Sequence, residues 1–188
     1  MKALFYVKKE KPCLYNVLGK YMTTEYMGKY FMQDGIKDPK LNGKIVAECD
    51  YEIEEIFYEM YGDLDWQHEE LPTTDTMSIV NLERASCMSR EKIEEQINDN
   101  GYAIHIKNLN IFDKPKELKD YSKRLFGRIT DGDFQVLGSA PKNMMKCCEI
   151  KYMVEDYILI SITPQEACNI LNYKQDVLVR RKVLKEIK

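Results

Sequence analysis

The sequence predicts an α+β fold, with a small, mostly antiparallel β-barrel and two or three short flanking helices. Apolar and polar residues alternate strictly over residues 44–54, which is typical of a half-buried strand. Thr163 and Glu166 form a capping box, which marks the start of a helix. About six or seven predicted strands are not separated regularly by helices, and this disfavours a doubly wound parallel sheet.

The composition is that of a globular protein. The chain has 188 residues, of which 44% are hydrophobic and 31% charged, and its net charge is −3. This length suits one domain, so we expect residues 1–188 to form a single domain. The negative balance disfavours a protein that coats nucleic acid by bulk charge, but it allows a local basic patch. No apolar run approaches the roughly 18–20 residues that span a bilayer, and no signal peptide is evident. We therefore predict a cytoplasmic protein that does not bind membranes.

Six cysteines are spread along the chain without metal-binding spacing: Cys13, Cys49, Cys87, Cys147, Cys148 and Cys168. None belongs to a C-x-x-C pair, and neither His68 nor His105 has a partner at zinc spacing. We expect reduced thiols and predict neither a metal nor a cofactor. Cys49 alternates with apolar residues and is predicted to lie in the core.

The N-terminal part predicts a strand, a long connection and a second strand. Residues 2–7 are apolar and aromatic, as in a strand. Residues 9–42, rich in Lys and Tyr, are expected to form an irregular and functional connection. Asn42 and Gly43 then give a turn signal before the alternating strand.

An acidic stretch follows, with ten Asp or Glu and no Lys or Arg over residues 48–70. One face of the predicted strand carries Glu48, Asp50, Glu52 and Glu54. A solvated acidic face is the simpler interpretation. The alternative is a surface that binds a basic partner or imitates the charge of nucleic acid.

The middle of the chain predicts a loop, two helices and a strand. Residues 63–84, with Trp66, are expected to be loop. Ser89 is predicted to cap a helix that ends before Gly101. A strand over 102–112 follows, on which His105 is interpreted as half-buried, and a second short helix is expected to begin at 113–115.

The last third predicts loop, strands and a capped helix. Residues 124–145 contain scattered glycines and are expected to form loops and turns. Strands are predicted on either side of residues 155–156, before the helix that the capping box begins. A final strand, "DVLVRRK", is expected to end the fold.

Three segments together resemble ASCH-domain proteins of the PUA-like superfamily, in the small versions found in phages and prophages. These segments are "GKIVAECDYEIEEI", "ASCMSREKIEEQINDNGYAIHIKNLNIFDKPKEL" and "ILISITPQEACNILNYKQDVLVRRK". The resemblance covers about two thirds of the chain and is most specific over "YAIHIKNLNIFDKPKEL". It implies a PUA-like barrel.

The order of the segments differs from that family. The segment that opens the domain in relatives lies here at 157–188, after family middle and C-terminal segments at 1–154. This order implies a circular permutation, which is tolerated where natural termini lie close together. A truncated tandem copy is the alternative. If the chain is permuted, we expect the strand near Val177–Arg181 to neighbour the strand near Leu4–Val7.

The family motif G-x-K-x-x-E-x-R is also altered. Aligned on "LNYKQDVLVR", its Gly, Lys and Glu positions hold Tyr173, Gln175 and Leu178, and only Arg180 is kept. The resemblance implies that relatives with amidohydrolase activity on modified cytidine use the motif Lys. Because Gln and Leu do not exchange protons, we expect no catalysis by this motif and no catalytic residue.

The first functional hypothesis is a non-catalytic PUA-like module that binds RNA, a nucleotide or a modified base in a cleft near Arg180. Its predicted ligand-binding residues are Arg180, Lys174, Arg181, Lys182, Gln175 and Tyr173. Tyrosines of the 9–42 connection are expected to stack on bases. A solubilising basic edge strand is the simpler interpretation of this segment.

Two alternatives remain. A phage-type protein-interaction or anti-defence inhibitor would use the acidic 48–70 surface, with Glu48, Asp50, Glu52 and Glu54 binding a host protein. An amidohydrolase acting on acylated cytidine would need relocated catalytic groups, for which Glu48, Asp50, His105 and Lys107 are the candidates on central strands. The oligomeric state is left open.

Overall fold

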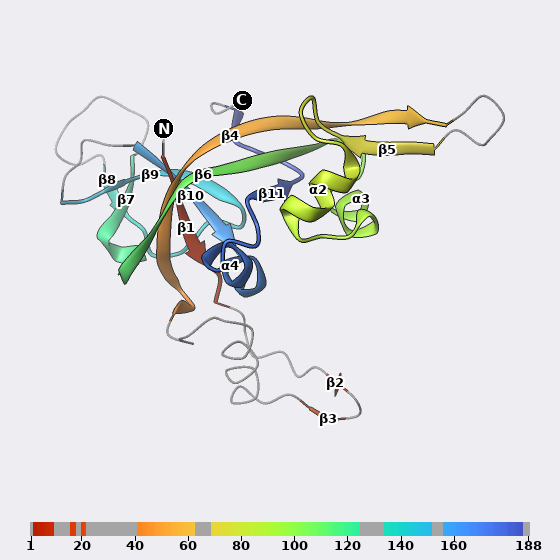
Figure 1. Ribbon diagram of the computed structural model, residues 1–188. Helices are drawn as coiled ribbons and strands as arrows, with labels where there is room; N and C mark the ends of the chain where they lie inside the picture. Colours follow the sequence, from red (N-terminus) through yellow and green to blue (C-terminus); the bar gives the residue numbers. More distant parts are fainter. Residues whose placement is uncertain are drawn as a thin grey trace. The chain divides into compact units, whose positions relative to one another are not determined.

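The structure is a computed structural model that describes residues 2–9, 16–17, 20–21, 41–62, 69–124, 134–151 and 156–185. It is an α+β fold dominated by strands (Figure 1). The strands are β1 (Lys2–Val7), β2 (Asn16–Val17), β3 (Lys20–Tyr21), β4 (Lys44–Tyr61), β5 (Glu69–Thr73), β6 (Gly101–Glu117), β7 (Tyr121–Arg124), β8 (Phe134–Val136), β9 (Met144–Glu149), β10 (Asp156–Ile162) and β11 (Val177–Arg180). The helices are α2 (Ile79–Ser86), α3 (Arg90–Ile97), α4 (Pro164–Leu171) and the short 3₁₀ helix η2 (Leu118–Asp120).

The chain forms two compact units, each built from two separate stretches. The first unit comprises Met1–Asp50 and Asn108–Asn172, and the second comprises Tyr51–Lys107 and Tyr173–Lys188. The long strands β4 and β6 each contribute one part to the first unit and one part to the second. The prediction of a single domain stays a prediction.

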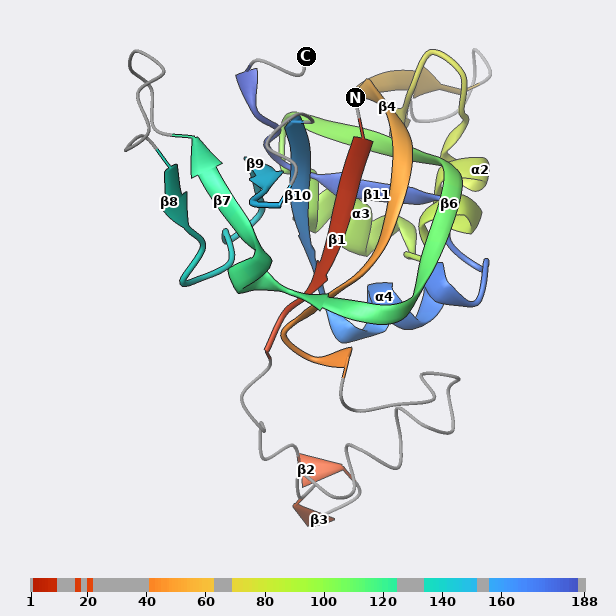
Figure 2. The same cartoon turned by 90° about the vertical axis from the view of Figure 1, so that its left-hand side faces the viewer.

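The first unit is built on a mixed sheet around β1. In it β1 pairs in parallel with β10 and antiparallel with β4. The order continues antiparallel from β10 through β9 and β7 to β8, and β7 and β8 lie side by side in Figure 2. Residues 3–7 of β1 are all buried, because this strand has a neighbour on each edge and apolar side chains on both faces.

The core of the first unit contains Leu4, Ile45, Tyr121, Cys147 and Leu159. The ring of Tyr121 meets that of Tyr157 edge-on, with 6.4 Å between the ring centroids. Burial and nearby carboxylates raise the pKa of the Cys49 thiol to about 12. The prediction that Cys49 lies in the core is therefore confirmed, and the five cysteines in the described part of the chain are all free thiols.

The C-terminal helix begins as predicted. The Thr163 hydroxyl accepts a hydrogen bond from the Glu166 backbone N–H at 3.1 Å, and the Glu166 carboxylate accepts from the Thr163 N–H at 2.8 Å. This reciprocal capping, with Pro164 at the first helical position, fixes the start of α4 directly after β10. Pro164, Ala167 and Ile170 are buried, so α4 turns its apolar side toward the first unit.

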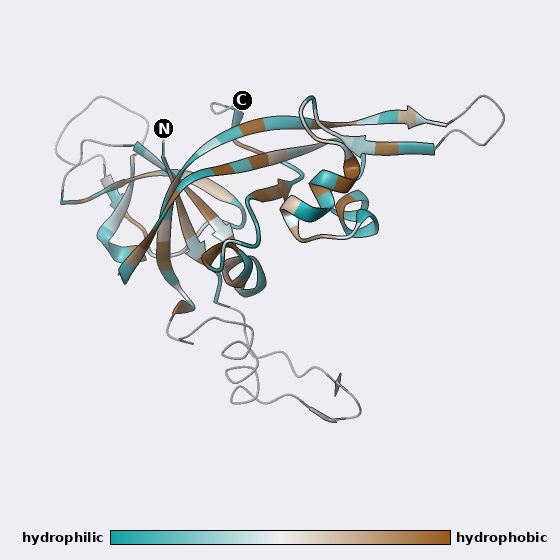
Figure 3. Cartoon of the chain, viewed as in Figure 1, coloured by the Kyte–Doolittle hydropathy of each residue, from teal (hydrophilic) through white to brown (hydrophobic). Residues whose placement is uncertain are grey.

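The second unit combines the far part of β4, the near part of β6, β5 and β11 with helices α2 and α3. β11 pairs antiparallel with β6, and β5 pairs antiparallel with the end of β4. The core joins Ile56, Leu82, Ile93, Ile97 and Val179. Along β4, apolar and polar bands alternate, as the sequence predicted (Figure 3). The predicted helix after Ser89 is confirmed as α3.

Three predicted elements are wrong. Residues 79–84, expected to be loop, belong to α2, and residues 69–73 form β5. Residues 134–136, within the expected loop at 124–145, form β8. The helix expected to begin at 113–115 does not form in this described segment. Instead, β6 continues to Glu117, and the short 3₁₀ helix η2 follows. Two contacts of Lys116 accompany the extended conformation of this part of β6. Its ammonium group lies 3.6 Å from the Glu149 carboxylate and 4.7 Å from the centre of the Phe112 ring.

The described strands leave the sheet open rather than closed into a barrel, with β11 and β8 at the two ends of the strand order. The expected adjacency of β11 and β1 is wrong, since both edges of β1 are occupied, by β4 and β10, and β11 pairs with β6. The mostly antiparallel pairing is confirmed; β1 with β10 is the one parallel pair among the described strand pairs. No helix in the described ranges is long and apolar enough to cross a bilayer.

Candidate functional site

The altered family motif lies in the second unit and is largely built into its interior. Arg180 is only 8% exposed, and its Nη1 atom donates to the Val179 carbonyl at 2.8 Å. Gln175 is also buried, and its side-chain amide donates to the Val177 carbonyl at 2.9 Å. Leu178 is fully buried. These contacts give Arg180 and Gln175 structural roles, and their predicted contact with a ligand stays a prediction.

The other predicted ligand-binding residues are on the surface. Tyr173 is 74% exposed and has a left-handed backbone, with φ of 55°, in the turn after α4. Lys174, Arg181 and Lys182 are exposed. Because Leu178 is inside and Tyr173 points outward, the basic residues surround a well-packed strand. The tyrosine-rich 9–42 connection and Trp66 lie outside the described residues, apart from a few positions at its ends and in β2 and β3.

The predicted acidic face on β4 is matched, residue by residue, by polar groups of the chain. In the first unit Glu48 accepts from Lys2 at 3.4 Å and from Asn110 at 3.1 Å. Asp50 accepts from the Asn108 amide at 2.8 Å. Both carboxylates therefore accept hydrogen bonds within the same unit, and Lys2 offsets the charge of Glu48, which reduces their availability to a partner.

In the second unit the same pattern continues. Glu52 pairs with Lys107 at 2.5 Å. The Glu54 carboxylate lies 2.9 Å from the His105 Nε2 atom. The interpretation of His105 as a half-buried strand residue is confirmed, and its partner, Glu54, had no signal in the sequence because the two are 51 positions apart. The amidohydrolase role of these groups stays a prediction.

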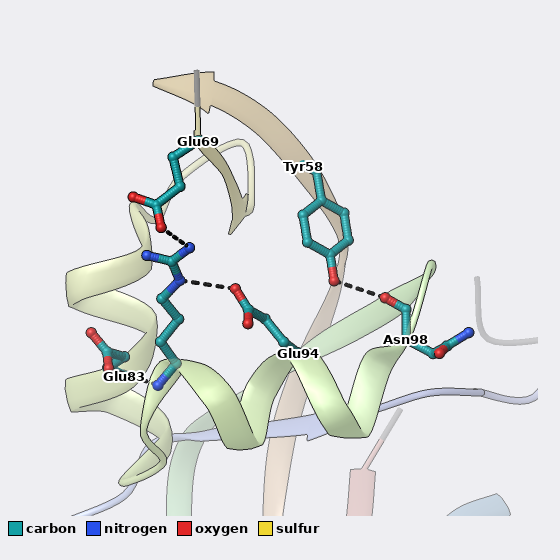
Figure 4. A network of polar contacts seen from close by, with 6 residues as sticks. Tyr58, Glu69, Glu83, Glu94 and Asn98 are labelled. Carbon is teal, nitrogen blue, oxygen red and sulfur yellow. Dashed lines mark hydrogen bonds and ion pairs between the residues drawn. The ribbon is translucent and has the colours of Figure 1, made fainter. Parts of the chain in front are cut away.

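A second polar network in this unit surrounds Arg90 at the start of α3. Its guanidinium donates to Glu69 at 2.6 Å and to Glu94 at 2.8 Å, and its backbone N–H donates to Glu83 at 2.8 Å. Figure 4 shows Glu69, on β5, and Glu94 reaching the guanidinium from two sides. The network ties β5 and α2 to α3, so it is a structural connection rather than a binding site.

A hollow in the first unit has the character of a binding site. This pocket, which we call the lysine pocket, has a volume of about 430 Å³. Its polar lining includes Tyr6, Lys9, Glu117, Lys119 and Ser139. A volume of a few hundred Å³ matches small-molecule sites in proteins. Lys9 and Lys119 are exposed, whereas Tyr6 is buried and forms part of the floor.

The electrostatics of the lysine pocket are dominated by cations. Lys44 forms an ion pair with Glu117, which lines the pocket. This hydrogen bond and the charges of Lys44, Lys119 and Lys9 lower the pKa of the Glu117 carboxyl. Burial raises the pKa of the Tyr6 hydroxyl although Lys44 opposes this, so the hydroxyl remains a protonated donor at neutral pH. Three lysines around one carboxylate leave a net positive site that suits an anion.

The backbone on two sides of the pocket is shaped by glycine. Gly43 has φ of +80°, and a Cβ atom there would lie 2.3 Å from the Lys9 side chain. At Gly138 a Cβ atom would meet no atom within 4 Å, so this wall is open to a ligand. Both glycines line the pocket.

The lysine pocket was missed in the sequence. Lys9 follows the first strand, and Lys119 lies within a segment predicted to be helical, so nothing in the spacing placed them together. The described residues contain no group of three His, Cys, Asp or Glu that could hold a metal ion. Comparison with protein-family models, with curated proteins and with solved structures finds no match to this chain.

Proposed function

We propose that this protein is a non-catalytic module that binds a phosphate-bearing ligand, such as a nucleotide or RNA, in the lysine pocket. The observation that carries the proposal is that Lys9 and Lys119 line one hollow of about 430 Å³, while Lys44 pairs with the carboxylate of its lining residue Glu117, in a chain of net charge −3. Lysines bind phosphates as point charges, and the Tyr6 hydroxyl and the Ser139 side chain add neutral hydrogen-bonding groups.

We further propose that the module is of the ASCH type within the PUA-like superfamily. The capped helix α4 between β10 and β11 supports this proposal, because a strand, a helix with Pro at its first position and a second strand follow in the order of the family's opening segment. Under this proposal the ligand site differs from the motif position near Arg180, which is filled by packed side chains.

Binding measurements on matched variants test the proposed function. Fluorescence anisotropy with a labelled RNA octamer and competition with unlabelled UMP should show binding at low salt that weakens as salt rises. The double variant Lys9→Gln/Lys119→Gln should weaken binding by about tenfold or more. Lys92→Gln/Lys185→Gln removes two exposed lysines outside the pocket and should leave binding unchanged.

A third variant separates the lysine pocket from the motif first expected to bind. Lys174→Gln/Arg181→Gln/Lys182→Gln removes exposed charge around β11 and leaves the lysine pocket intact. Little effect is expected. Loss of binding in this variant alone would show that the ligand binds near Arg180 rather than in the lysine pocket. No binding by the wild type at low salt would overturn the proposed function.

One observation favours the protein-interaction role as a second candidate. Near the end of β4, Glu55 and Glu59 are exposed on the same face as Tyr61, which is 45% exposed. A carboxylate surface with an exposed aromatic side chain suits a basic partner with an apolar anchor. Chemical crosslinking to a candidate host nuclease, with Glu55→Lys/Glu59→Lys and Tyr61→Ser as variants, tests this role, and equal yields in all variants would contradict it.

A further inference from the structure

A second pocket lies against the same wall of the first unit. It has a volume of about 300 Å³, and its lining includes Lys123, Gln135, Val136 and Met145. Residues 137–139 line both this pocket and the lysine pocket. The two hollows therefore adjoin along one short segment of backbone, which lies between them. We call the second hollow the β7–β8 pocket, because Lys123 belongs to β7 and Gln135 to β8.

The shared wall is anchored and yet open to a ligand. Leu137 is buried in the core, and its N–H donates to the Tyr121 carbonyl at 2.9 Å, which holds the segment against η2 and β7. Gly138 and Ser139, which follow directly, are exposed. A ligand that crosses this wall would pass over two exposed residues without a bulky side chain and would meet no steric barrier at Gly138.

The chemical groups of the two pockets differ in a useful way. The lysine pocket offers clustered positive charge from Lys9 and Lys119. The β7–β8 pocket offers one exposed cation, Lys123, together with the amide of Gln135 and the side chain of Val136, which is 54% exposed. In nucleic-acid sites a cation contacts a phosphate, an amide hydrogen-bonds a base edge, and an apolar surface packs against a base face.

The presence of a second pocket with its own cation favours a nucleic-acid strand over a mononucleotide. A mononucleotide in the lysine pocket would leave the β7–β8 pocket and its cation unused. A linked nucleotide would place a second base and phosphate beyond the shared wall. Separate cations along a path, rather than one cluster, are the pattern of proteins that follow the backbone of a single strand.

We propose that the ligand is single-stranded nucleic acid and that it crosses residues 137–139. One phosphate contacts Lys9 and Lys119, and the next nucleotide lies in the β7–β8 pocket with its phosphate near Lys123 and its base against Gln135 and Val136. This inference rests on the proposed function and extends it, because it names the ligand class and adds a second subsite.

The test compares a strand with a mononucleotide across matched variants. Labelled octamers of uridine and of deoxyuridine are titrated by anisotropy, and UMP binding is measured by calorimetry on the same protein. Lys123→Gln should weaken octamer binding by about three- to tenfold and reduce the slope of log affinity against log salt by about one, because one phosphate contact is lost. It should leave the affinity for UMP unchanged.

Two further variants make the result specific. Gln135→Ala/Val136→Ser should weaken octamer binding with an unchanged salt slope, because it removes base contacts rather than charge. Lys92→Gln, an exposed lysine on α3, is the control and should behave as the wild type. Thermal melting of each variant verifies folding, and Lys123→Met provides a second substitution at that exposed position. Binding of both octamers supports recognition through the sugar–phosphate strand, and preference for uridine adds a contact with the 2′-hydroxyl.

The outcomes separate this inference from the proposed function. If Lys9→Gln/Lys119→Gln abolishes binding while Lys123→Gln and Lys123→Met leave octamer affinity and salt slope unchanged, the site takes a single nucleotide, and the strand proposal is overturned while the proposed function stands. If neither octamer nor UMP binds the wild type at low salt, both are overturned.

Discussion

The Nε2 atom of His105 lies 2.9 Å from the Oε2 atom of Glu54, and this contact joins β6 to β4 within the second unit. The Thr76 hydroxyl approaches both oxygens of the same carboxylate, at 2.9 and 2.8 Å. Burial acts to raise the pKa of Glu54, but hydrogen bonds from Thr76, Thr74 and His105 outweigh it and lower this pKa below its ordinary value of 4.5.

The lowered pKa of Glu54 predicts a contribution to stability that depends on pH. Because the folded-state pKa lies below the unfolded value, the ionised carboxylate stabilises the fold above about pH 4.5, and this contribution is lost as the pH falls through the folded pKa. Glu54→Gln should therefore lose less unfolding free energy than the wild type between about pH 5 and pH 3. Urea unfolding followed by circular dichroism at several pH values measures this. Glu95→Gln, on the exposed side of α3, is the control, and parallel pH profiles for Glu54→Gln and wild type would contradict the prediction.

Arg90 is expected to depend on its planar, forked head group rather than on charge alone. Arg90→Lys keeps the charge but cannot donate to Glu69 and Glu94 in the same geometry. We expect a lower midpoint of urea unfolding for Arg90→Lys, with Lys92→Met unchanged. The effect should shrink in high salt, since the network is partly exposed. A midpoint equal to that of the wild type at low salt would show that the network is not stabilising.

Two tyrosines give opposite predictions for removal of a hydroxyl. The Tyr121 hydroxyl is buried and has no hydrogen-bond partner among the described residues. Tyr121→Phe should therefore be neutral or stabilise the protein by up to about 1 kcal/mol, because an unpaired polar group leaves the interior. The Tyr58 hydroxyl donates to the Asn98 carbonyl at 2.7 Å, so Tyr58→Phe should cost about 0.5 kcal/mol. Denaturant unfolding measures both, and a clear loss of stability in Tyr121→Phe would indicate a partner for that hydroxyl.

The two glycines of the lysine pocket also form a matched pair. Gly43 has φ of +80°, so Gly43→Ala should destabilise the fold by about 1 kcal/mol and displace Lys9. Gly138→Ala meets no steric contact and should change stability by less than about 0.5 kcal/mol. Thermal unfolding of both variants checks the contrast, and equal effects would disagree with the backbone conformation at Gly43.

The cysteines should differ sharply in their reaction with iodoacetamide. Burial raises the pKa of Cys49 and of Cys147 to about 12, so few thiolates form there at neutral pH. Cys87 is exposed at the end of α2 and should be alkylated first, although burial of part of its surface also raises its pKa. Peptide mass spectrometry after timed alkylation measures the order. Modification of Cys49 or Cys147 before Cys87 would mean that the first unit opens readily.

Local patterns predicted the elements that local physics controls. Alternation gave the first part of β4, and Ser89 and Thr163 gave the starts of α3 and α4, although only the Thr163 side chain makes the predicted capping hydrogen bond. The segment at 113–115 was misread because Asp and Pro commonly start helices, whereas β6 continues there as a strand. The sequence analysis missed helix α2, although Ile79 and Leu82 have helical spacing. The reason is that residue types typical of loops stand before and after them in the sequence.

The candidate site was the least predictable part. The sequence drew attention to Arg180 through its resemblance to the ASCH motif, but burial is a property of the folded chain. The lysine pocket brings together Lys9, which follows β1, and Lys119, which lies in η2, far apart in sequence. No spacing rule brings such residues together, because their approach depends on which strands pair.

The sequence by itself determined the α+β class, the strand at 44–54, the capped C-terminal helix and the position of Cys49 in the core. Each of these follows from the period of side chains along a strand or from hydrogen bonds at a helix end, which depend on a few neighbouring residues. Only the tertiary structure decided that Glu54 meets His105, that Arg180 is inside, and that lysines gather beside Gly43. Those outcomes depend on long-range strand pairing, and the local sequence does not specify which strands pair or which of their residues lie opposite each other.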